Sequence, residues 1–414
     1  MDLVFDVIFY IFTFLAVYVQ IFLFITFLEN RKNIGNNKEE IKLVKYPAVT
    51  VIVPCWNEEQ GVHKTIRSLF NLNYPKEKLK IILVDDGSTD NTWGVISKYA
   101  KYPNVRVFHK ENGGKYTALN LGLEHTDTEF LGCLDADSTA DKQALVRLMH
   151  FFEKVPELMA VTPSLIVDNP RNIVERAQKA EYYMGVYVKK MLGFLGAIQV
   201  TPGPLTIFRK KVFDDLGPYF HAHNTEDMEI AYRMQKHYYP IEQCLDAFVY
   251  TNTPSSIGKL FKQRLRWIYG FINNSIDYRS ILFRKKYGNF SVFTVPSNIL
   301  AMAASTYIFG RVIWEAVSFI SSKVLQYKTV GINLTASANN IDFFFINTQS
   351  SFFLGIFVIF LVILSLSIGY RLAKGKGVVS PDLIYFFFIF SFIAPFWLMK
   401  AVYNTALSRR PSWR

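Results

Sequence analysis

The chain has 414 residues and a mass of 47.8 kDa, enough for two or three ordinary domains. Half of its residues are hydrophobic and 16% are aromatic, a composition that excludes a disordered chain. The net charge of +12 is not accompanied by a basic run with interleaved aromatic residues, so we expect no nucleic-acid partner. We attribute this charge mainly to basic residues that flank cytoplasmic membrane ends, and partly to an anionic partner.

The first segment, residues 5–28, is apolar and carries a single charge, Asp6. A membrane-spanning helix needs roughly 20 such residues. The segment lacks a basic n-region and a small-residue cleavage site, so we predict a retained anchor and not a signal peptide. Basic residues follow it, which predicts that the downstream domain is cytoplasmic and the N-terminus lies outside.

From Pro47 onward, strand patterns and helix patterns alternate. Strands are predicted at 48–54, 80–86 and 105–110 and over 129–139, and helices are predicted at 58–72 and 116–126. This alternation is typical of a parallel sheet with crossover helices. In such sheets the ligand site lies beyond the carboxyl ends of the strands. Acidic residues follow several of these predicted strands, which predicts a polar site at that edge.

The second half of the chain contains further helical patterns and three more apolar segments. Residues 173–200 are amphipathic, and a helix is predicted to begin after an N-cap residue, Thr225. The apolar segments lie at about 290–320, 350–370 and 383–404, and each is long enough to span a membrane. The first contains Arg311 and Glu315, which either neutralise each other near an interface or line a polar path.

One N-terminal span and three C-terminal spans would place the basic tail, residues 408–414, outside the cell. This contradicts the positive-inside rule. Either one segment is re-entrant or interfacial, or the tail breaks the rule. Pro395 lies inside the last segment and favours a broken or re-entrant piece there.

Cysteine usage fits a reducing, cytoplasmic compartment for the middle of the chain. The three cysteines, Cys55, Cys133 and Cys244, are far apart in sequence and form no C-x-x-C pair. A zinc knuckle or a redox pair is therefore not predicted.

Two acidic motifs follow predicted strands. Asp135 and Asp137, in "DAD", are expected on the same side of an extended chain. Carboxylates of this kind suit Mg²⁺ or Mn²⁺ when substrate phosphates complete the coordination, although D-x-D also occurs in many acidic loops. Asp85 and Asp86, in "VDDGSTD", are expected at the sheet edge, with a solvated turn as an equally good interpretation.

The segment "NGGKYTALN" does not match a P-loop, because the required first glycine is replaced by His109 and the hydroxyl residue by Tyr116. Lys115 remains at the start of a helix, where it either binds an anion or is simply exposed. "TED" places Glu226 and Asp227 in the first turn of a helix. Acids are common there, and a role for Asp227 as general base requires that it face the pocket.

The segment "QRLRW" places Gln263, Arg266 and Trp267 on one face of a helix. Arginine suits bidentate phosphate contact and tryptophan suits stacking on a sugar. An aromatic-basic anchor at the membrane edge is the alternative. Arg264 lies off this face and is predicted to contact lipid headgroups.

The order of the motifs carries a family resemblance. "VPCWNEE", "VDDGSTD", "GGKYTALN", "CLDADS", "TEDMEIAYR" and "KQRLRW" follow one another over residues 48–270. This series resembles the membrane-embedded, processive family 2 glycosyltransferases, such as cellulose, chitin, hyaluronan and poly-N-acetylglucosamine synthases. The resemblance implies a GT-A (Rossmann-like) α/β domain at 31–255, after a membrane helix at 1–30. Interfacial helices at 256–287 and a membrane region at 288–414 would follow.

The resemblance also implies residue roles. Asp227 would be the catalytic base, and Asp137 would bind Mg²⁺ or Mn²⁺. The residues expected to bind the donor nucleotide sugar are Pro54, Glu58, Asp86 (at the uracil), Lys115, Asp135 and Arg266, and those expected to bind the acceptor are Gln263, Trp267 and Gly203.

The implied function is an inverting, metal-dependent transferase that polymerises a UDP-sugar, by our hypothesis UDP-GlcNAc, into a β-linked polysaccharide and passes it across the plasma membrane. The catalytic domain would be cytoplasmic in a multi-pass protein, with membrane lipid around it and room for an accessory membrane subunit or a homo-oligomer. Two alternatives stay open: a transferase that adds one sugar to a lipid-linked acceptor, and a non-catalytic membrane protein that binds nucleotide sugars.

Overall fold

The computed structural model describes residues 2–34, 41–330, 350–374, 380–409 and 411. It divides into two compact units. The helical unit comprises Met1–Phe22 and Ser297–Leu364, and the sheet unit comprises Leu23–Pro296 and Ser365–Arg414. Each is considered by itself below.

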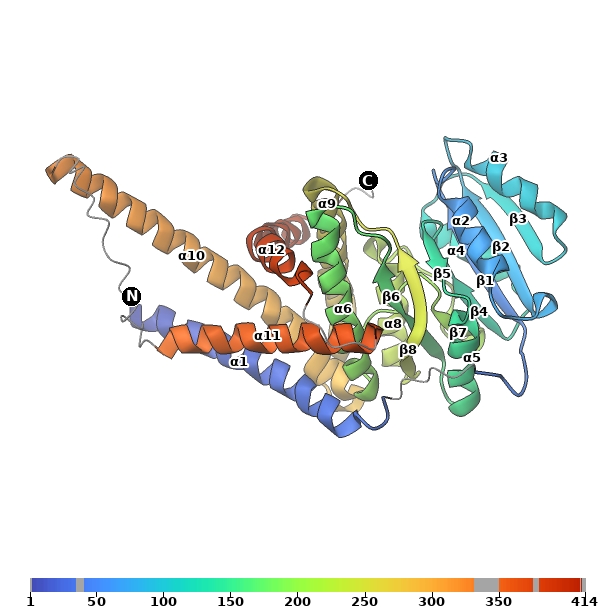
Figure 1. Cartoon of the computed structure of the whole chain (residues 1–414), viewed down its shortest axis with the longest axis horizontal. Helices are drawn as coiled ribbons and strands as arrows, with labels where there is room; N and C mark the ends of the chain where they lie inside the picture. The colour runs from blue at the N-terminus through green and yellow to red at the C-terminus, as the bar shows by residue number, and fades with distance from the viewer. Residues whose placement is uncertain (1, 35–40, 331–349, 375–379, 410, 412–414) are drawn as a thin grey trace. The chain divides into compact units, whose positions relative to one another are not determined.

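The sheet unit is built on one mixed sheet of eight strands, in the order β3-β2-β1-β4-β7-β6-β8-β5 among the described residues (Figure 1). The first four neighbours, β3, β2, β1 and β4, are all parallel, as the alternating pattern predicted. Beyond β4 the sheet becomes mixed, because β7 pairs antiparallel with both β4 and β6. The strands are β1 Val49–Cys55, β2 Leu79–Asp86, β3 Val105–Lys110, β4 Phe130–Cys133, β5 Ser138–Ala140, β6 Ala160–Val167, β7 Ile207–Arg209 and β8 Ile241–Thr251.

The helices of the sheet unit follow the strands as crossovers and as a layer beside the sheet. The crossovers are α2 Val62–Phe70, α3 Thr92–Ile96, α4 Lys115–Glu124 and α5 Ala144–Lys154. The later helices are α6 Ile173–Phe194, α7 Lys211–Leu216, α8 Glu226–Lys236, α9 Ile257–Asp277 and α12 Asp382–Ala406. Figure 1 shows α6, α9 and α12 close together, and α12 packs against both α6 and α9.

Local sequence signals explain why these elements begin where they do. β1 is a run of β-branched residues, buried almost throughout, as expected for a central parallel strand. Asn172 and Glu175 form a capping box that starts α6. The Ser256 hydroxyl accepts a hydrogen bond from the backbone N–H of Lys259 and starts α9.

Four helices among the described residues are long and apolar enough to cross a membrane. They lie in α1 Asp2–Asn30, α10 Val295–Val330 with the π-helical turn before it, α11 Ser350–Lys374, and α12. The second candidate span covers 40 residues, Phe290–Thr329, or about 60 Å of helix, roughly twice the hydrocarbon core. It is therefore longer than the predicted segment at 290–320.

The charged pair and the proline inside these segments were the subject of two predictions. The Arg311 Nε and Glu315 Oε1 atoms are 2.6 Å apart, so the pair neutralises its own charge. α12 is continuous through Pro395. The prediction of a broken segment there is therefore wrong, because the neighbouring turns stay helical around the proline.

Candidate active site

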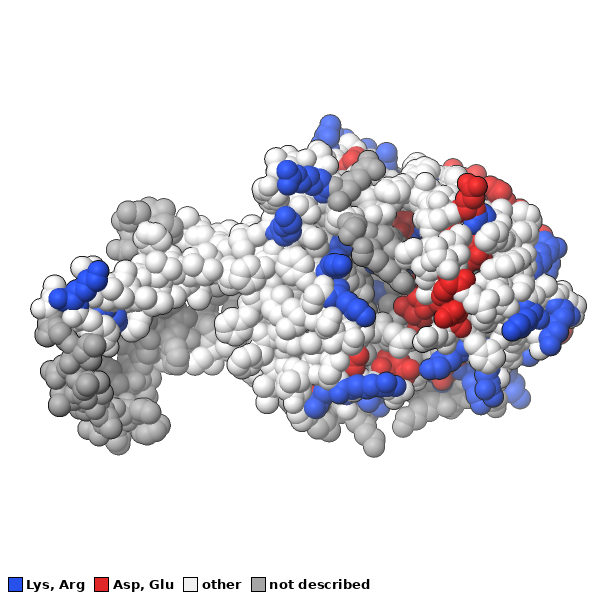
Figure 2. Space-filling view, turned by 90° about the horizontal axis from the view of Figure 1, so that it is seen from above, with Lys and Arg blue, Asp and Glu red and all other residues white. Residues whose placement is uncertain are grey.

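The predicted site residues gather at the carboxyl ends of β1, β2 and β4, on the starts of α4 and α8, and on the middle of α9. Figure 2 shows acidic side chains collected in a hollow of the surface, with lysines and arginines at its margins. A small pocket of about 10 Å³ brings three of the predicted residues together, Lys115, Gly203 and Asp227. A larger cavity of about 500 Å³ lies at the opposite, amino ends of β1–β3, so size alone does not identify the site.

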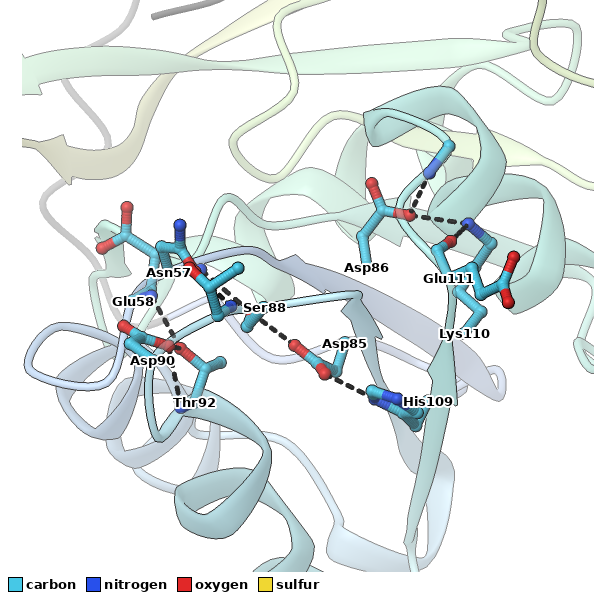
Figure 3. Close-up of polar contacts among 12 residues, drawn as sticks. Asn57, Glu58, Asp85, Asp86, Ser88, Asp90, Thr92, His109, Lys110 and Glu111 are labelled. Atoms are coloured by element: carbon cyan, nitrogen blue, oxygen red, sulfur yellow. Dashed lines mark hydrogen bonds and ion pairs between the residues drawn. The ribbon is translucent and has the colours of Figure 1, made fainter.

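At the end of β2, the two adjacent aspartates have different partners (Figure 3). Asp85 is fully buried and accepts a hydrogen bond from Ser88, and its Oδ2 lies 2.6 Å from His109 Nδ1. Asp86 accepts hydrogen bonds from Lys110 at 2.7 Å and from the backbone N–H of Gly114 at 2.9 Å. Asp86 therefore holds the glycine loop before α4, and any contact with uracil would have to share these oxygens.

The end of β1 is joined to the turn that follows β2. The backbone N–H of Glu58 donates to Thr92 Oγ1 at 2.8 Å. Asn57 has a left-handed backbone (φ 54°), which asparagine tolerates, and its side-chain oxygen accepts from the Thr89 N–H at 2.8 Å. Pro54 lies opposite Val84 in the ladder. These contacts fix the predicted nucleotide-binding loops beside each other.

The "DAD" motif lies in a turn and not on an extended strand. β4 ends at Cys133, and the Ser138 N–H donates to the Asp135 backbone carbonyl at 3.0 Å. The prediction that Asp135 and Asp137 extend β4 is therefore wrong, although the two carboxylates remain neighbours. Desolvation by the surrounding residues and then the charge of Asp135 raise the pKa of Asp137 to about 6.

Lys115 is the hub of the charged groups at the start of α4. Its Nζ lies 2.7 Å from Asp135 Oδ1 and 3.3 Å from Glu226 Oε1. A Cβ placed on Gly203 would lie 2.6 Å from the same Nζ, so a larger residue there would displace the lysine amine. Glu226 was not among the predicted site residues. The two carboxylates neutralise the lysine before any diphosphate is present.

Asp227, at the start of α8, is half-buried beside this hub. Burial, followed by the charge of Glu226, raises its pKa to about 6, while Lys115 and Arg266 act in the opposite direction. Its backbone carbonyl accepts from Thr201 Oγ1 at 2.8 Å. A carboxylate with such a pKa is ionised near neutral pH and basic enough to accept a proton.

Thr225 occupies the N-cap position of α8, but its side chain does not cap the helix. Its hydroxyl donates to the Ala222 carbonyl at 2.9 Å and accepts from Asn274 at 2.9 Å. The prediction of a threonine cap is correct in position and wrong in mechanism. The hydroxyl instead links α8 to α9.

On α9, the three residues of the predicted face lie near the same turn. Arg266 donates to the Asn224 backbone carbonyl at 2.9 Å and acts electrostatically on Asp227. The Gln263 side-chain oxygen is buried and has no hydrogen-bond partner among the described residues. An unsatisfied buried oxygen is costly and is explained if a ligand supplies a donor.

Arg264 does not contact lipid headgroups, contrary to the prediction. It is 5% exposed, its NH2 atom lies 2.7 Å from Glu181 Oε2 on α6, and its guanidinium stacks 4.2 Å from the Trp267 ring centroid. The helical-wheel argument placed Arg264 off the face of Gln263, Arg266 and Trp267. It could not show that the opposite face is covered by another helix.

The structure adds α6 to the site, which the sequence analysis did not. Burial raises the pKa of Tyr182 to about 12, with smaller contributions from neighbouring charges that include the "DAD" acids, and Asp227 opposes the effect of burial on Lys189. These positions are seven residues apart and so lie on one helix face. Burial lowers the pKa of Lys189 to about 8. Among the described residues its amine makes no hydrogen bond or ion pair, whereas Lys190 pairs with Glu242 at 3.1 Å.

A divalent cation fits the acidic residues of the turn. Burial and then the neighbouring carboxylates of Asp135 and Glu58 raise the pKa of Asp137, and a cation would relieve the repulsion among these acids. Among the described residues, no group of three His, Cys, Asp or Glu side chains could hold a metal by itself. Mg²⁺ is commonly bound by one or two protein carboxylates, and substrate phosphates and water molecules supply its remaining ligands.

The sequence of the chain is similar to known glycosyltransferases. Residues 50–217 match the family model "Glycosyl transferase family 2". A poly-β-1,6-N-acetyl-D-glucosamine synthase of Staphylococcus epidermidis is 29% identical over 281 residues, 67% of each chain. The synthase of the same name from Staphylococcus aureus strain COL is 31% identical over 237 residues, 57% of each chain. The matched stretches thus span 57% to 67% of these relatives' own length.

Among solved structures, a mannosyltransferase from Pyrobaculum calidifontis in complex with GDP-Man and Mn²⁺ aligns over 96% of this chain and 99% of its own. The TM-score is 0.58 at 17% identity. The likeness concerns the fold alone. It confirms the predicted GT-A fold flanked by apolar helices.

Proposed function

We propose that this chain, which carries a family 2 glycosyltransferase domain, transfers N-acetylglucosamine from UDP-GlcNAc to the end of a growing β-linked polysaccharide. The single observation that carries the proposal is that Lys115 of α4 and Arg266 of α9 converge on the start of α8, which carries Asp227, next to the "DAD" carboxylates. The choice of sugar rests on the poly-N-acetylglucosamine synthases that the chain resembles.

The residues can be given complementary roles in a direct displacement. Asp227 takes the proton from the acceptor hydroxyl as the new bond to the anomeric carbon forms. The bond to the diphosphate breaks on the opposite side, so an α-linked donor gives a β-linked product. Arg266 and Lys115 supply positive charge where the leaving diphosphate becomes more negative, an effect that often dominates catalysis.

Asp137, with Asp135 beside it, would hold Mg²⁺ or Mn²⁺, which when bound neutralises diphosphate charge. We propose Mn²⁺ or Mg²⁺ because the structural neighbour contains Mn²⁺. Gln263 and Trp267 would contact the acceptor: the buried amide oxygen of Gln263 accepts a sugar hydroxyl, and the Trp267 ring stacks on a pyranose face. Gly203 would keep the sugar pocket open.

We place the catalytic domain in the cytoplasm of a multi-pass plasma-membrane protein, from the basic residues after the first span. The product would leave through the membrane helices. A second candidate is a transferase that adds a single sugar to a lipid-linked acceptor. It is favoured by the nearly full-length match to a mannosyltransferase that was solved with GDP-Man.

The test is to incubate the purified protein with radiolabelled UDP-GlcNAc or GDP-mannose, Mn²⁺ and membrane lipid. We expect a polymer made from UDP-GlcNAc and digested by a β-1,6-N-acetylglucosaminidase. A single sugar on lipid would support the second candidate, and no UDP release at all would support a nucleotide-sugar-binding protein without activity.

The catalytic role of Asp227 gives the first prediction. Asp227→Asn should lower the transfer rate by about a hundred- to ten-thousand-fold, because general-base help is lost. UDP binding, measured by calorimetry, should be nearly unchanged, since Asp227 acts on the acceptor hydroxyl. Lost UDP binding would show that Asp227 is not simply the base.

A further inference from the structure

A left-handed turn precedes the helix that carries Asp227. Ala222, His223 and Asn224 have φ angles of 43°, 57° and 64°. Residues that carry a Cβ atom adopt this region at an energetic cost and usually one at a time. Every other non-glycine residue with a positive φ in the described part of the chain stands alone in sequence. Three such residues in a row therefore need support from the surrounding structure.

His223 joins the middle of this turn to α9. Its Nε2 atom lies 2.9 Å from the Asp277 Oδ2 atom. Its ring also meets the Tyr269 ring edge-on, with the centroids 6.1 Å apart. The His223 side chain is 25% exposed and that of Asp277 is 57% exposed, and an exposed ion pair contributes little by itself. His223 is therefore held against α9 by ring packing as well as by charge.

The backbone of the turn is held by the same helix. Arg266 donates to the Asn224 carbonyl at 2.9 Å, and Asn274 donates to the Thr225 hydroxyl at 2.9 Å. That hydroxyl donates in its turn to the Ala222 carbonyl at 2.9 Å. The directions of the two carbonyls depend on the left-handed dihedral angles. A turn that relaxed to right-handed angles would therefore rotate both carbonyls and break these contacts.

The close approach of α9 to the turn depends on a glycine. A Cβ placed on Gly270 would lie 2.3 Å from Thr225 Oγ1 and 2.4 Å from Thr225 Cγ2. Glycine inside a helix is unfavourable relative to alanine, and this contact explains why α9 has one at position 270. A Cβ placed on Gly258 of the same helix would meet nothing within 4 Å. The two glycines therefore form a matched pair, of which only Gly270 faces the turn.

The turn lies between two groups that the proposed reaction needs. Asp227 follows it in the first turn of α8, where its backbone carbonyl accepts from Thr201 Oγ1 at 2.8 Å. Burial and the charge of Glu226 raise the pKa of Asp227, whereas the charges of Lys115 and Arg266 act against this rise. Arg266 thus binds the turn and lies near the proposed base. The turn keeps the geometry between the arginine and the base constant.

We infer that the turn Ala222–Asn224 is a strained support for Asp227, and that His223 is a positioning residue for the reaction. Through Asp277 and Tyr269, His223 keeps the turn left-handed. The turn then holds the start of α8 against α9, in the place from which Asp227 reaches an acceptor hydroxyl. The inference rests on the proposed role of Asp227 as the base, and it does not depend on which sugar is transferred.

The first test compares His223→Ala with His237→Ala, which changes the exposed residue after α8. UDP release by the full chain is measured over a range of UDP-GlcNAc concentrations. We expect kcat to fall about tenfold to a hundredfold in His223→Ala, because a misplaced group loses this much rate. The KM for UDP-GlcNAc and the melting temperature should change little. An unchanged kcat, or a loss that lies entirely in KM, would overturn the inference.

The strain itself is tested by rescue. Ala222→Gly removes the Cβ that disfavours the left-handed region, so its combination with His223→Ala should recover most of the lost kcat. A loss that Ala222→Gly does not recover would show that His223 does not act through the turn. Gly270→Ala should lower kcat about tenfold or more, since its Cβ displaces Thr225, whereas Gly258→Ala should not. Equal rates in these two variants would contradict the support of the turn by α9.

Hydrogen exchange gives a measurement that needs no substrate. The amides of Met228 and Glu229 both donate to the Thr225 carbonyl, at 3.1 and 3.0 Å, so their exchange reports on the turn. In His223→Ala they should exchange about tenfold faster, while the amides of α6 keep their rate. Unchanged exchange would overturn the inference whatever the donor sugar is. Full transfer by Asp227→Asn would instead refute the base itself, and an inactive Asp227→Asn beside a fully active His223→Ala would refute only the positioning role.

Discussion

At the scale of single residues, the pKa of Asp227 determines when the proposed base is active. The folded-state pKa is raised to about 6 by burial and by Glu226. The ionised form is therefore present above that value and is lost as the pH falls through it. The transfer rate should reach its maximum above about pH 7 and should decline below pH 6.

Glu226→Gln tests this assignment because it removes the nearest negative charge. The apparent pKa of the transfer rate should move downward, so the variant keeps more activity at pH 5.5 than the wild-type chain does. The measurement is the initial rate of UDP release between pH 5 and pH 8 at saturating donor. Glu124→Gln, at an exposed position on α4, is the matched control, and an upward shift in Glu226→Gln would contradict the electrostatic explanation.

At the scale of elements, one face of α6 lies close to the candidate site. Tyr182, Gly185 and Lys189 recur at helical spacing on one face, and Tyr182 and Lys189 are under the influence of the "DAD" and "TED" acids. Gly185 is exposed, and a Cβ placed on it would meet nothing within 4 Å. We propose that this face of α6 contacts the acceptor sugar.

Lys189→Met is the corresponding prediction. Loss of a hydrogen bond from a charged donor costs about 1.5–3 kcal/mol, so the acceptor KM should rise about tenfold to a hundredfold. Hydrolysis of the donor by water and UDP affinity should change little, since the amine does not lie among the expected donor ligands. Lys189→Arg should restore part of the loss, and Lys64→Met on α2 is the control. An unchanged acceptor KM would show that this face does not bind the acceptor.

Some strands and the family resemblance could be predicted from the sequence, whereas the contacts between distant segments could not. β1 and β2 could be predicted because buried parallel strands are continuous apolar runs, and the order of the motifs predicted the resemblance to family 2 glycosyltransferases that the comparisons support. The three-residue β7 carries too little pattern to show that it pairs antiparallel with β4 and β6. The partners of Arg264 and Lys115 come from segments distant in sequence, which periodicity within one helix cannot show.

At the largest scale, that of the sheet unit, α12 packs against α6 and α9 beside the candidate site. The Arg264 guanidinium lies 5.9 Å from the Phe390 ring centroid, and the rings of Phe261 and Trp397 are 6.3 Å apart. α12 thus supports the helix that carries Gln263 and Trp267. Its attachment at the other end depends on one carboxylate, Asp382, whose side chain is 2% exposed.

Asp382→Asn should therefore weaken both stability and transfer. The substitution leaves the Arg176 and Lys179 charges without their acid, although both basic side chains keep contact with solvent. We therefore expect a modest fall of about 5 °C in the melting temperature in detergent. Transfer should fall with acceptor affinity, while UDP binding persists, since the nucleotide loops lie on β1 and β2. Asp215→Asn, which removes the acid of the exposed Lys211 pair, should leave both properties unchanged. Equal effects of the two substitutions would show that α12 is not held by Asp382 and does not support the acceptor side of the site.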